Sequence, residues 1–456
     1  MDNQNHNVLN DDRIGKLLLK FSLPAFLGLF VMTLYNVVDT IFIGRYVGSL
    51  GIAGLSIAFP VQMLILGVGQ MIGVGGASVI SRALGANNPQ KAKKTLGNAI
   101  SISIIVSIVI TAVGIANSES LLRLMGASND VLPYASDYTV IILIGTIAQI
   151  FALTLSSTVR AEGNARVPMI SMIIGGVANI GLDAVFVINL GMGTQGAAIA
   201  TVIGQVISVI YLLRYYYSGR SSLDLSFRNL RIVGEYIKEI LAIGVASFVQ
   251  FFATGISAVF INRVLGSYGG DIAISAYGII NRVAMFTIMP GMVIGQGLQP
   301  ILGFNYGAKR YDRALKSIKI SIIVATACNI VIFLVLHFLP EPIIRIFTTD
   351  SALVEMSVHV AKYVFLVVYV MGIGILGSLI FQSVGRVTQS LVTAIVRPLA
   401  LILLVFTLPK LWQTDGVWLS FPIADAIAFA LSLVLLINQI KSLKNTDSPQ
   451  VVDVSK

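Results

Sequence analysis

The chain has 456 residues, of which 56% are hydrophobic and only 11% are charged, and its mean hydropathy is +0.88. A soluble domain carries roughly 25% charged residues, so this composition excludes an ordinary soluble enzyme. The net charge is +10. Its Lys and Arg residues are concentrated in alternate connecting segments, which is the positive-inside pattern of a membrane protein and argues against a nucleic-acid partner.

The apolar residues form separated runs, each near the 20 or so residues that a membrane-spanning helix needs. We therefore predict an all-α integral membrane protein with twelve transmembrane helices. The distribution of Lys and Arg predicts a multi-pass protein of the cell (plasma or inner) membrane with both termini in the cytoplasm. The predicted helices cover residues 15–44, 51–81, 95–122, 131–160, 167–190, 195–217, 232–265, 272–304, 314–340, 353–383, 387–408 and 415–440.

The two halves of the chain repeat. Residues 52–86 align without a gap with residues 274–308, at a constant offset of 222 residues. Each half has an even number of helices, so the repeat is parallel and predicts two pseudo-symmetric six-helix lobes. The predicted organisation is an N-lobe (1–217), a cytoplasmic linker (218–231), a C-lobe (232–444) and a disordered tail (445–456). Glycines repeat in the same register and also permit close helix packing: Gly69, Gly73, Gly75 and Gly85 align with Gly291, Gly295, Gly297 and Gly307.

The sequence lacks the motifs of common enzyme classes. It has neither a phosphate-binding G-x-x-x-x-G-K-[ST] loop nor an H-E-x-x-H zinc motif, so we expect no enzymatic activity and no cofactor. The three histidines (His6, His337 and His359) are far apart, and the single Cys328 cannot form an internal disulfide.

Asp39 and Asp183 lie inside predicted spans of the first half, where an ionisable group is costly. Asp39, Asp183 and Thr201 are placed roughly 8 to 10 Å from the outer ends of three helices. Asn179 lies one turn before Asp183, and Asn36 is three residues before Asp39. These oxygen ligands suit a proton or a small hard cation such as Na⁺. A purely structural polar network is the alternative.

A second polar cluster is predicted in the C-lobe. Arg282, Arg397 and Asp425 all lie at a depth of roughly 15 Å, near the middle of the bilayer. We interpret them as a neutralising ion-pair network with a structural role, and a role in transport is the alternative. The repeat places no acid opposite Asp39 or Asp183, since Ser257 and Val405 lie near those places.

Other residues are candidates for substrate contact and movement. Pro24 lies inside the first helix, where it removes a backbone hydrogen bond and permits a bend, so we predict a hinge there. The side chains predicted to line the substrate path are Met32, Tyr35, Asn36 and Gln205.

Four segments together resemble the multidrug and toxic compound extrusion (MATE) family: FSLPAFLGLFVMTLYNVVDTIFIG, ISRALGANNPQKAKK, RAEGNARVPM and NIGLDAVFVINLGMGTQGAAIATVIGQ. The resemblance covers about residues 10 to 440, and its acids point to the DinF-type branch. It implies two six-helix lobes and export of mostly cationic, lipophilic compounds in exchange for H⁺ or Na⁺. It also implies a first-lobe cation site at Asp39, Asn179, Asp183 and Thr201, supported by Tyr138.

The chain departs from one pattern of that family. Members with a cation site in the second lobe carry an acid inside the seventh helix, where this chain has Gln250 and other neutral residues.

From the resemblance as a whole we predict a multidrug efflux antiporter that works by alternating access, as a monomer, with lipophilic small molecules as its substrates. The alternative is a flippase for a lipid or lipid-linked precursor, whose cavity should be lined by several Arg and Lys. A simple channel is a further alternative, which the two-fold repeat makes less favourable.

Overall fold

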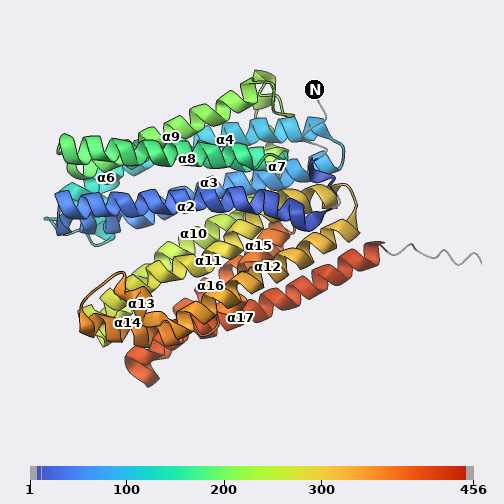
Figure 1. Cartoon of the computed structure of the whole chain (residues 1–456). Coiled ribbons are helices and arrows are strands. Elements are labelled where there is room, and N and C mark those ends of the chain that lie inside the picture. Colours follow the sequence, from blue (N-terminus) through green and yellow to red (C-terminus); the bar gives the residue numbers. More distant parts are fainter. Residues whose placement is uncertain (1–7, 12, 448–456) are drawn as a thin grey trace, which may run out of the picture. The chain divides into compact units, whose positions relative to one another are not determined.

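The computed structural model describes residues 8–11 and 13–447, and within them it contains helices and no strands (Figure 1). Ten helices are long and apolar enough to cross a membrane, and two bent helix pairs pass the same test when each is taken as one span. The predicted all-α membrane protein of twelve transmembrane helices in two pseudo-symmetric six-helix lobes is confirmed. The part of the predicted tail beyond residue 447 lies outside the described residues, whereas 445–447 continue the last helix.

The helices group into two compact units. Among the described residues, the first contains 8–10, 20–84 and 88–256, and the second contains 11, 13–19, 85–87 and 257–447. The predicted boundary at 218–231 stays a prediction, since the first unit also includes the start of the seventh span. The elements up to that span are α2 (Ile14–Tyr46), α3 (Ser49–Gly85), α4 (Pro89–Ala116), α5 (Ser118–Leu124), α6 (Leu132–Ile144), α7 (Thr146–Ala161), α8 (Arg166–Asp183), the π-helix η1 (Ala184–Asn189), α9 (Gly193–Tyr217), the 3₁₀ helix η2 (Phe227–Leu230) and α10 (Gly234–Tyr268).

The second unit takes the end of α10 and the remaining helices. Its apolar core includes Trp418, which is fully buried. The elements are α11 (Gly270–Gly307), α12 (Tyr311–Phe338), α13 (Pro340–Arg345), α14 (Ser351–Val364), α15 (Val368–Ser383), α16 (Val387–Thr407) and α17 (Pro409–Asp447).

Two of the predicted helices are broken in the structure. The predicted helix 131–160 bends by 51° between α6 and α7, and 353–383 bends by 59° between α14 and α15. A break leaves backbone carbonyls without helical partners, and in a membrane these need a donor. Thr111 donates its hydroxyl to the carbonyl oxygen of Leu143, in the last turn before the first break (2.6 Å). At the second break, Asn329 donates its amide to the carbonyl oxygen of Val368, the first residue of α15 (3.1 Å).

The repeat is present in the backbone as well as in the sequence. Four of the seven described residues with positive φ in the first half have a counterpart with positive φ 222 positions later. Gln413 stands where the first half has Gly191, so a side chain occupies a left-handed position at the kink in α17. The pairs are Gly48 and Gly270, Asn87 and Lys309, Gly163 and Gly385, and Gly191 and Gln413.

Glycine packing follows the same offset. A Cβ on Gly69 would lie 2.6 Å from Leu153 of α7, and one on Gly291 would lie 3.1 Å from Ile375 of α15. Leu153 and Ile375 are themselves 222 residues apart. The repeated glycines therefore bring the second span of each half against its bent fourth span.

In the first unit, α3 and α10 approach each other closely beside an ion-pair cluster. A Cβ on Gly75 would lie 2.0 Å from the carbonyl oxygen of Ile240, far inside van der Waals contact. Two turns along α3, Arg82 binds Glu239 at 3.1 Å, and Lys91 binds the other oxygen of that carboxylate at 2.8 Å. The helices can lie this close only because Gly75 has no side chain.

We expect Gly75→Ala to lower the apparent melting temperature of the detergent-purified protein by about 5 °C or more, since the new methyl meets rigid backbone. Thermal unfolding followed by intrinsic fluorescence measures this. Gly374→Ala in α15 is the matched control, because a Cβ there has nothing within 4 Å. Equal melting temperatures for the two variants would show that the close approach is not required.

Candidate ion-coupling site

The site in the first unit is built on the pairing of α8 with α9, which run side by side (Figure 1). A Cβ on Gly175 would lie 2.7 Å from the carbonyl oxygen of Gly204, and one on Gly204 would lie 2.6 Å from that of Gly175. Ser171 and Ser208 fix the register by donating their hydroxyls to each other's carbonyl oxygens, at 3.1 and 2.9 Å. This contact places Asn179 of α8 beside Thr201 of α9.

Three of the predicted polar residues form one buried network. The hydroxyl of Thr201 donates to a carboxylate oxygen of Asp39 at 3.4 Å. Asn179 reaches the Thr201 hydroxyl at 3.4 Å in one orientation of its amide. In the opposite orientation its nitrogen donates to Asp39 at 3.1 Å, and its oxygen accepts from the backbone nitrogen of Thr201 at 3.3 Å. The second orientation pairs each donor with an acceptor.

Asp183 completes the site in an unusual environment. It is the last residue of α8, directly before the π-helix η1, and its side chain is fully buried. Its carboxyl group lies within hydrogen-bonding reach of Asp39. No described side chain or backbone group donates to either of its oxygens. Two acceptors in contact need a proton or a cation between them.

Tyr138 lies next to the carboxyl pair and is held by a residue that the sequence analysis missed. Its hydroxyl accepts a 2.6 Å hydrogen bond from Gln62 of α3, and it interacts electrostatically with Asp39 and Asp183. Because the Tyr138 oxygen acts as the acceptor in this bond, its hydroxyl hydrogen can be donated to another acceptor. In the sequence, Gln62 could have been recognised as a polar residue inside an apolar span, two residues after Pro60.

The second unit has an apolar core at the equivalent positions. At an offset of 222, Ile261, Leu401 and Val405 replace Asp39, Asn179 and Asp183, and Val360 replaces Tyr138. All four belong to the buried apolar cluster of that unit. Ile261 lies one turn after Ser257, the residue that the sequence analysis placed near the position equivalent to Asp39. The fold therefore does not need polar groups at these positions.

The oxygen atoms of this site suit a hard cation as well as a proton. Asp39 and Asp183 supply carboxylates, Thr201 a hydroxyl and Asn179 an amide oxygen, which are the ligand types that Na⁺-like ions prefer. The two buried oxygens of Asp183 have no hydrogen-bond donor among the described residues. They would therefore gain most from a bound proton or cation. No cluster of three or more His, Cys, Asp or Glu is found among the described residues, so a transition-metal site is not indicated there.

The residues predicted to line the substrate path differ in placement. Tyr35 packs against α8, since a Cβ on Gly176 would lie 3.3 Å from its ring. Asn36 is exposed and donates its amide to the carbonyl oxygen of Met32, so it is not joined to the Asp39 network. Met32 and Gln205 are partly buried.

The predicted C-lobe network is only partly formed. Arg397 donates from Nε to Asp425, whose side chain is almost completely buried. Arg282 is exposed, and no hydrogen bond or ion pair joins it to another described residue. The expectation of one three-residue network is therefore corrected to one ion pair and one separate arginine. Equal depth in the membrane did not fix the direction in which each side chain points.

Pro24, the predicted hinge, lies in a helix that is unbroken in this structure. It is buried, and one turn later Gly28 allows Met172 of α8 to pack against α2, because a Cβ there would lie 2.8 Å from its sulfur. Proline leaves the carbonyl one turn earlier without its helical donor, so a bend at this point breaks no backbone hydrogen bond.

The sequence analysis also missed Glu162, which joins α7 to the linker between the two halves. Its side chain is 1% exposed, and one oxygen accepts hydrogen bonds from the hydroxyl of Ser221 (2.8 Å) and from the backbone and hydroxyl of Ser222 (3.0 and 3.1 Å). Burial raises the pKa of Glu162 to about 7, although the bonds from Ser221 and Ser222 lower it. Its position in a short polar connection gave no sign of burial.

This raised pKa gives the folded state a defined pH dependence. The folded protein retains a proton on Glu162 that the unfolded chain has lost, so stability should fall as the pH rises from about 4.5 to about 7, by up to about 3 kcal/mol. Glu162→Gln should flatten the apparent melting temperature measured across this range. Glu235→Gln, which changes an exposed acid at the start of α10, is the control. A slope that survives in Glu162→Gln contradicts the assignment.

Comparisons with known proteins match nearly the whole chain. The MatE family model matches residues 24–185 and 242–407. The multidrug export protein MepA of Staphylococcus aureus (strain MRSA252) is 26% identical over 443 residues, which are 96% of this chain and 97% of MepA. Among solved structures, the MATE multidrug transporter DinF-BH is 39% identical, with a TM-score of 0.87 over 94% of this chain and 97% of its own. An outward-facing MATE multidrug resistance transporter is 25% identical, with a TM-score of 0.92 over 97% and 99% of the two chains.

Proposed function

The chain belongs to the MatE family and is a membrane transporter, not an enzyme, and on this premise we propose that it is a multidrug efflux antiporter. It exports lipophilic, mostly cationic small molecules and takes up H⁺ or Na⁺ in exchange. The names of its relatives MepA and DinF-BH, both multidrug transporters, support the substrate class. The 39% identity to DinF-BH favours the DinF-type branch. Members of this family need no cofactor.

The observation that carries the proposal is the contact between Asp39 and Asp183, with no donor on Asp183. Charged carboxylates repel each other at this distance, and burial removes the water that would screen them. An incoming proton or cation neutralises the pair. The apolar equivalents in the second unit support a functional reason for the acids, because the same scaffold packs there without them.

Ion binding can drive export if the ion and the substrate favour different states of the protein. The ion loads at Asp39, Asn179, Asp183 and Thr201 from outside and stabilises the state from which the substrate has left. The two ligands need not share atoms, because coupling requires only different affinities for the two conformations. One charge that crosses 100 mV supplies about 2.3 kcal/mol, which is enough to shift such an equilibrium.

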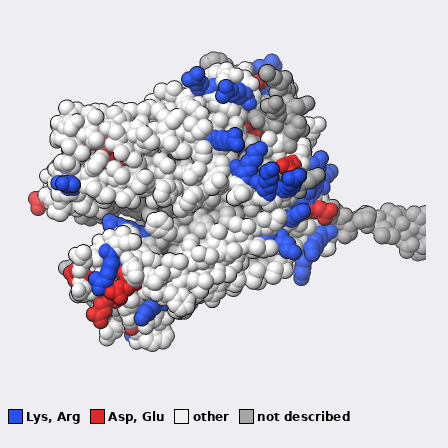
Figure 2. Space-filling view, in the orientation of Figure 1, with Lys and Arg blue, Asp and Glu red and all other residues white. Residues whose placement is uncertain are grey.

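The orientation proposed for the chain follows from its charges. Figure 2 shows Lys and Arg gathered mainly at the right-hand side of the view. The α3–α4 junction is basic, with Arg82, Lys91, Lys93 and Lys94 close together in the chain. The positive-inside rule then places this junction and both termini in the cytoplasm of a cell-membrane protein. The proposed working unit is a monomer.

We expect Asp39→Asn and Asp183→Asn each to reduce efflux by about tenfold or more, because a neutral amide cannot be neutralised by the driving ion. The measurement is efflux of a fluorescent lipophilic cation from reconstituted vesicles, with pH and sodium gradients imposed separately. The gradient that drives wild-type efflux identifies the coupling ion. Asp415→Asn is the control, because Asp415 is a half-exposed acid of α17 that contacts His359 at 3.0 Å and lies in the second unit. Full activity in both site variants would refute the assignment.

We further propose that neutralising Asp39 lets α2 bend at Pro24. Pro24→Ala restores the missing backbone hydrogen bond and should slow transport severalfold while leaving the site residues in place. Comparing initial efflux rates with the binding of the fluorescent cation to purified protein separates movement from binding. Unchanged transport in Pro24→Ala would exclude a bend at this residue as a necessary step.

A further inference from the structure

The outer half of α11 presents an exposed face that does not suit lipid. Its exposed residues recur at helical spacing, so they share one side of the helix. Lipid-facing α12 differs, since its exposed side chains include Ile323, Val331 and Leu334. On α11 the exposed positions from Ser275 to Arg282 are small or polar, with exposed Ile272 before them and exposed Met285 and Phe286 after them. The face comprises Ser275, Gly278, Asn281, Arg282, Met285 and Phe286.

Arg282 carries a charge deep in the span. It lies twelve residues after the start of α11, roughly 18 Å along the helix. Asp425 lies at a similar depth, twelve residues after the kink at Gln413, but Arg397 already binds it. Arg282 has no hydrogen-bond or ion-pair partner among the described residues. An arginine in this position must face water or an anionic ligand, because hydrocarbon does not solvate it.

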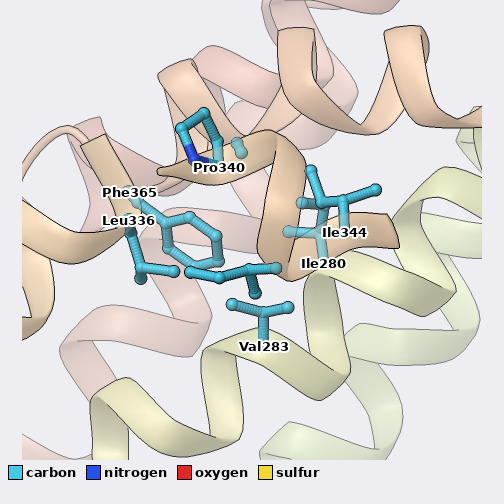
Figure 3. A pocket seen from close by; sticks show the side chains of 8 residues that line it. Ile280, Val283, Leu336, Pro340, Ile344 and Phe365 are labelled. Atoms are coloured by element: carbon cyan, nitrogen blue, oxygen red, sulfur yellow. The ribbon is translucent and has the colours of Figure 1, made fainter. Parts of the chain in front are cut away.

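The opposite face of α11 fixes this orientation. Figure 3 shows Ile280 and Val283 packed with Leu336, Ile344 and Phe365 around a small apolar pocket. These two residues flank Asn281 and Arg282 in the sequence. Rotating α11 to bury Arg282 would expose them, so the arginine is held on the outer side.

The repeat shows that the fold does not require this charge. Pro60 of α3 stands 222 residues before Arg282. The repeated second span is therefore built without an arginine in the first unit. A residue that is costly in a membrane and unnecessary for the fold calls for a functional explanation.

We propose that Arg282 binds the anionic group of amphiphilic substrates, a carboxylate or a sulfonate, and so determines specificity for molecules that carry one. The planar guanidinium can bind such a group through two parallel hydrogen bonds. Met285 and Phe286 lie one turn further along the same face and supply apolar contact. The depth of Arg282 argues against a lipid headgroup as the ligand. This inference rests on the proposed export function.

The test is a matched pair of dyes, rhodamine B, which has a free carboxylate, and its ethyl ester, which does not. Fluorescence polarisation gives the Kd of each for the purified full-length protein in detergent. Arg282→Gln should weaken binding of the carboxylate dye by about tenfold or more, because a charge-assisted hydrogen bond is lost. It should strengthen binding of the cationic ester, because a positive charge is removed. Arg282→Lys keeps the positive charge but loses the planar pair of donors, so its affinity should lie between wild type and Arg282→Gln for the carboxylate dye and match wild type for the ester.

Arg263→Gln is the matched control. Arg263 is an exposed arginine of α10 in the same unit, within the same Ile-Asn-Arg-Val sequence, but nearer the end of its helix. It should leave both affinities unchanged. Equal losses for the two dyes in Arg282→Gln, or no loss for the carboxylate dye, would overturn the inference. Wild type and variants are compared at one fixed pH and sodium concentration, and the binding assay needs no ion gradient, so failure here is distinguishable from failure of the efflux proposal.

Discussion

Two buried carboxyl groups in contact, Asp39 and Asp183, are the constraint on which the first unit depends. Their proximity is unfavourable while both are charged, so the ion binding that we propose would stabilise this arrangement. The surrounding structure maintains the contact. Paired glycines let α8 approach α9, and the π-helix begins directly after Asp183, where a local change of helical pitch redirects the chain.

The repeat separates what the fold requires from what the site requires. Both halves share left-handed backbone positions, glycine contacts and a bent fourth span at the same offset. Yet the positions of Asp39, Asn179 and Asp183 become apolar in the second unit, where they pack as an ordinary core. Where the first unit has Gly175, the second has Arg397, which binds Asp425. One scaffold thus supports a neutralisable acid pair in one unit and a permanently neutralised ion pair in the other.

The spans, the repeat and the two membrane acids could be predicted because each depends on composition or on linear spacing. The bend at Gly145 could not, since no proline marks it and hydropathy is averaged across the break. The grouping of Arg282 with Asp425 was wrong because depth along a helix says nothing about which side faces a neighbour. Gln62 and Glu162 were missed because a single polar residue acquires meaning only from partners far away in the sequence.

The two kinds of charge in this protein differ in what can neutralise them. The acid pair in the first unit accepts a proton or a metal cation, both of which are always present in solution. Arg282 in the second unit presents only hydrogen-bond donors, so an anionic ligand or water is needed to pair with it. If both proposals hold, the protein can respond separately to the coupling ion and to an acidic group on its substrate. Substrate selectivity at Arg282 would then not compete with ion binding at Asp39 and Asp183.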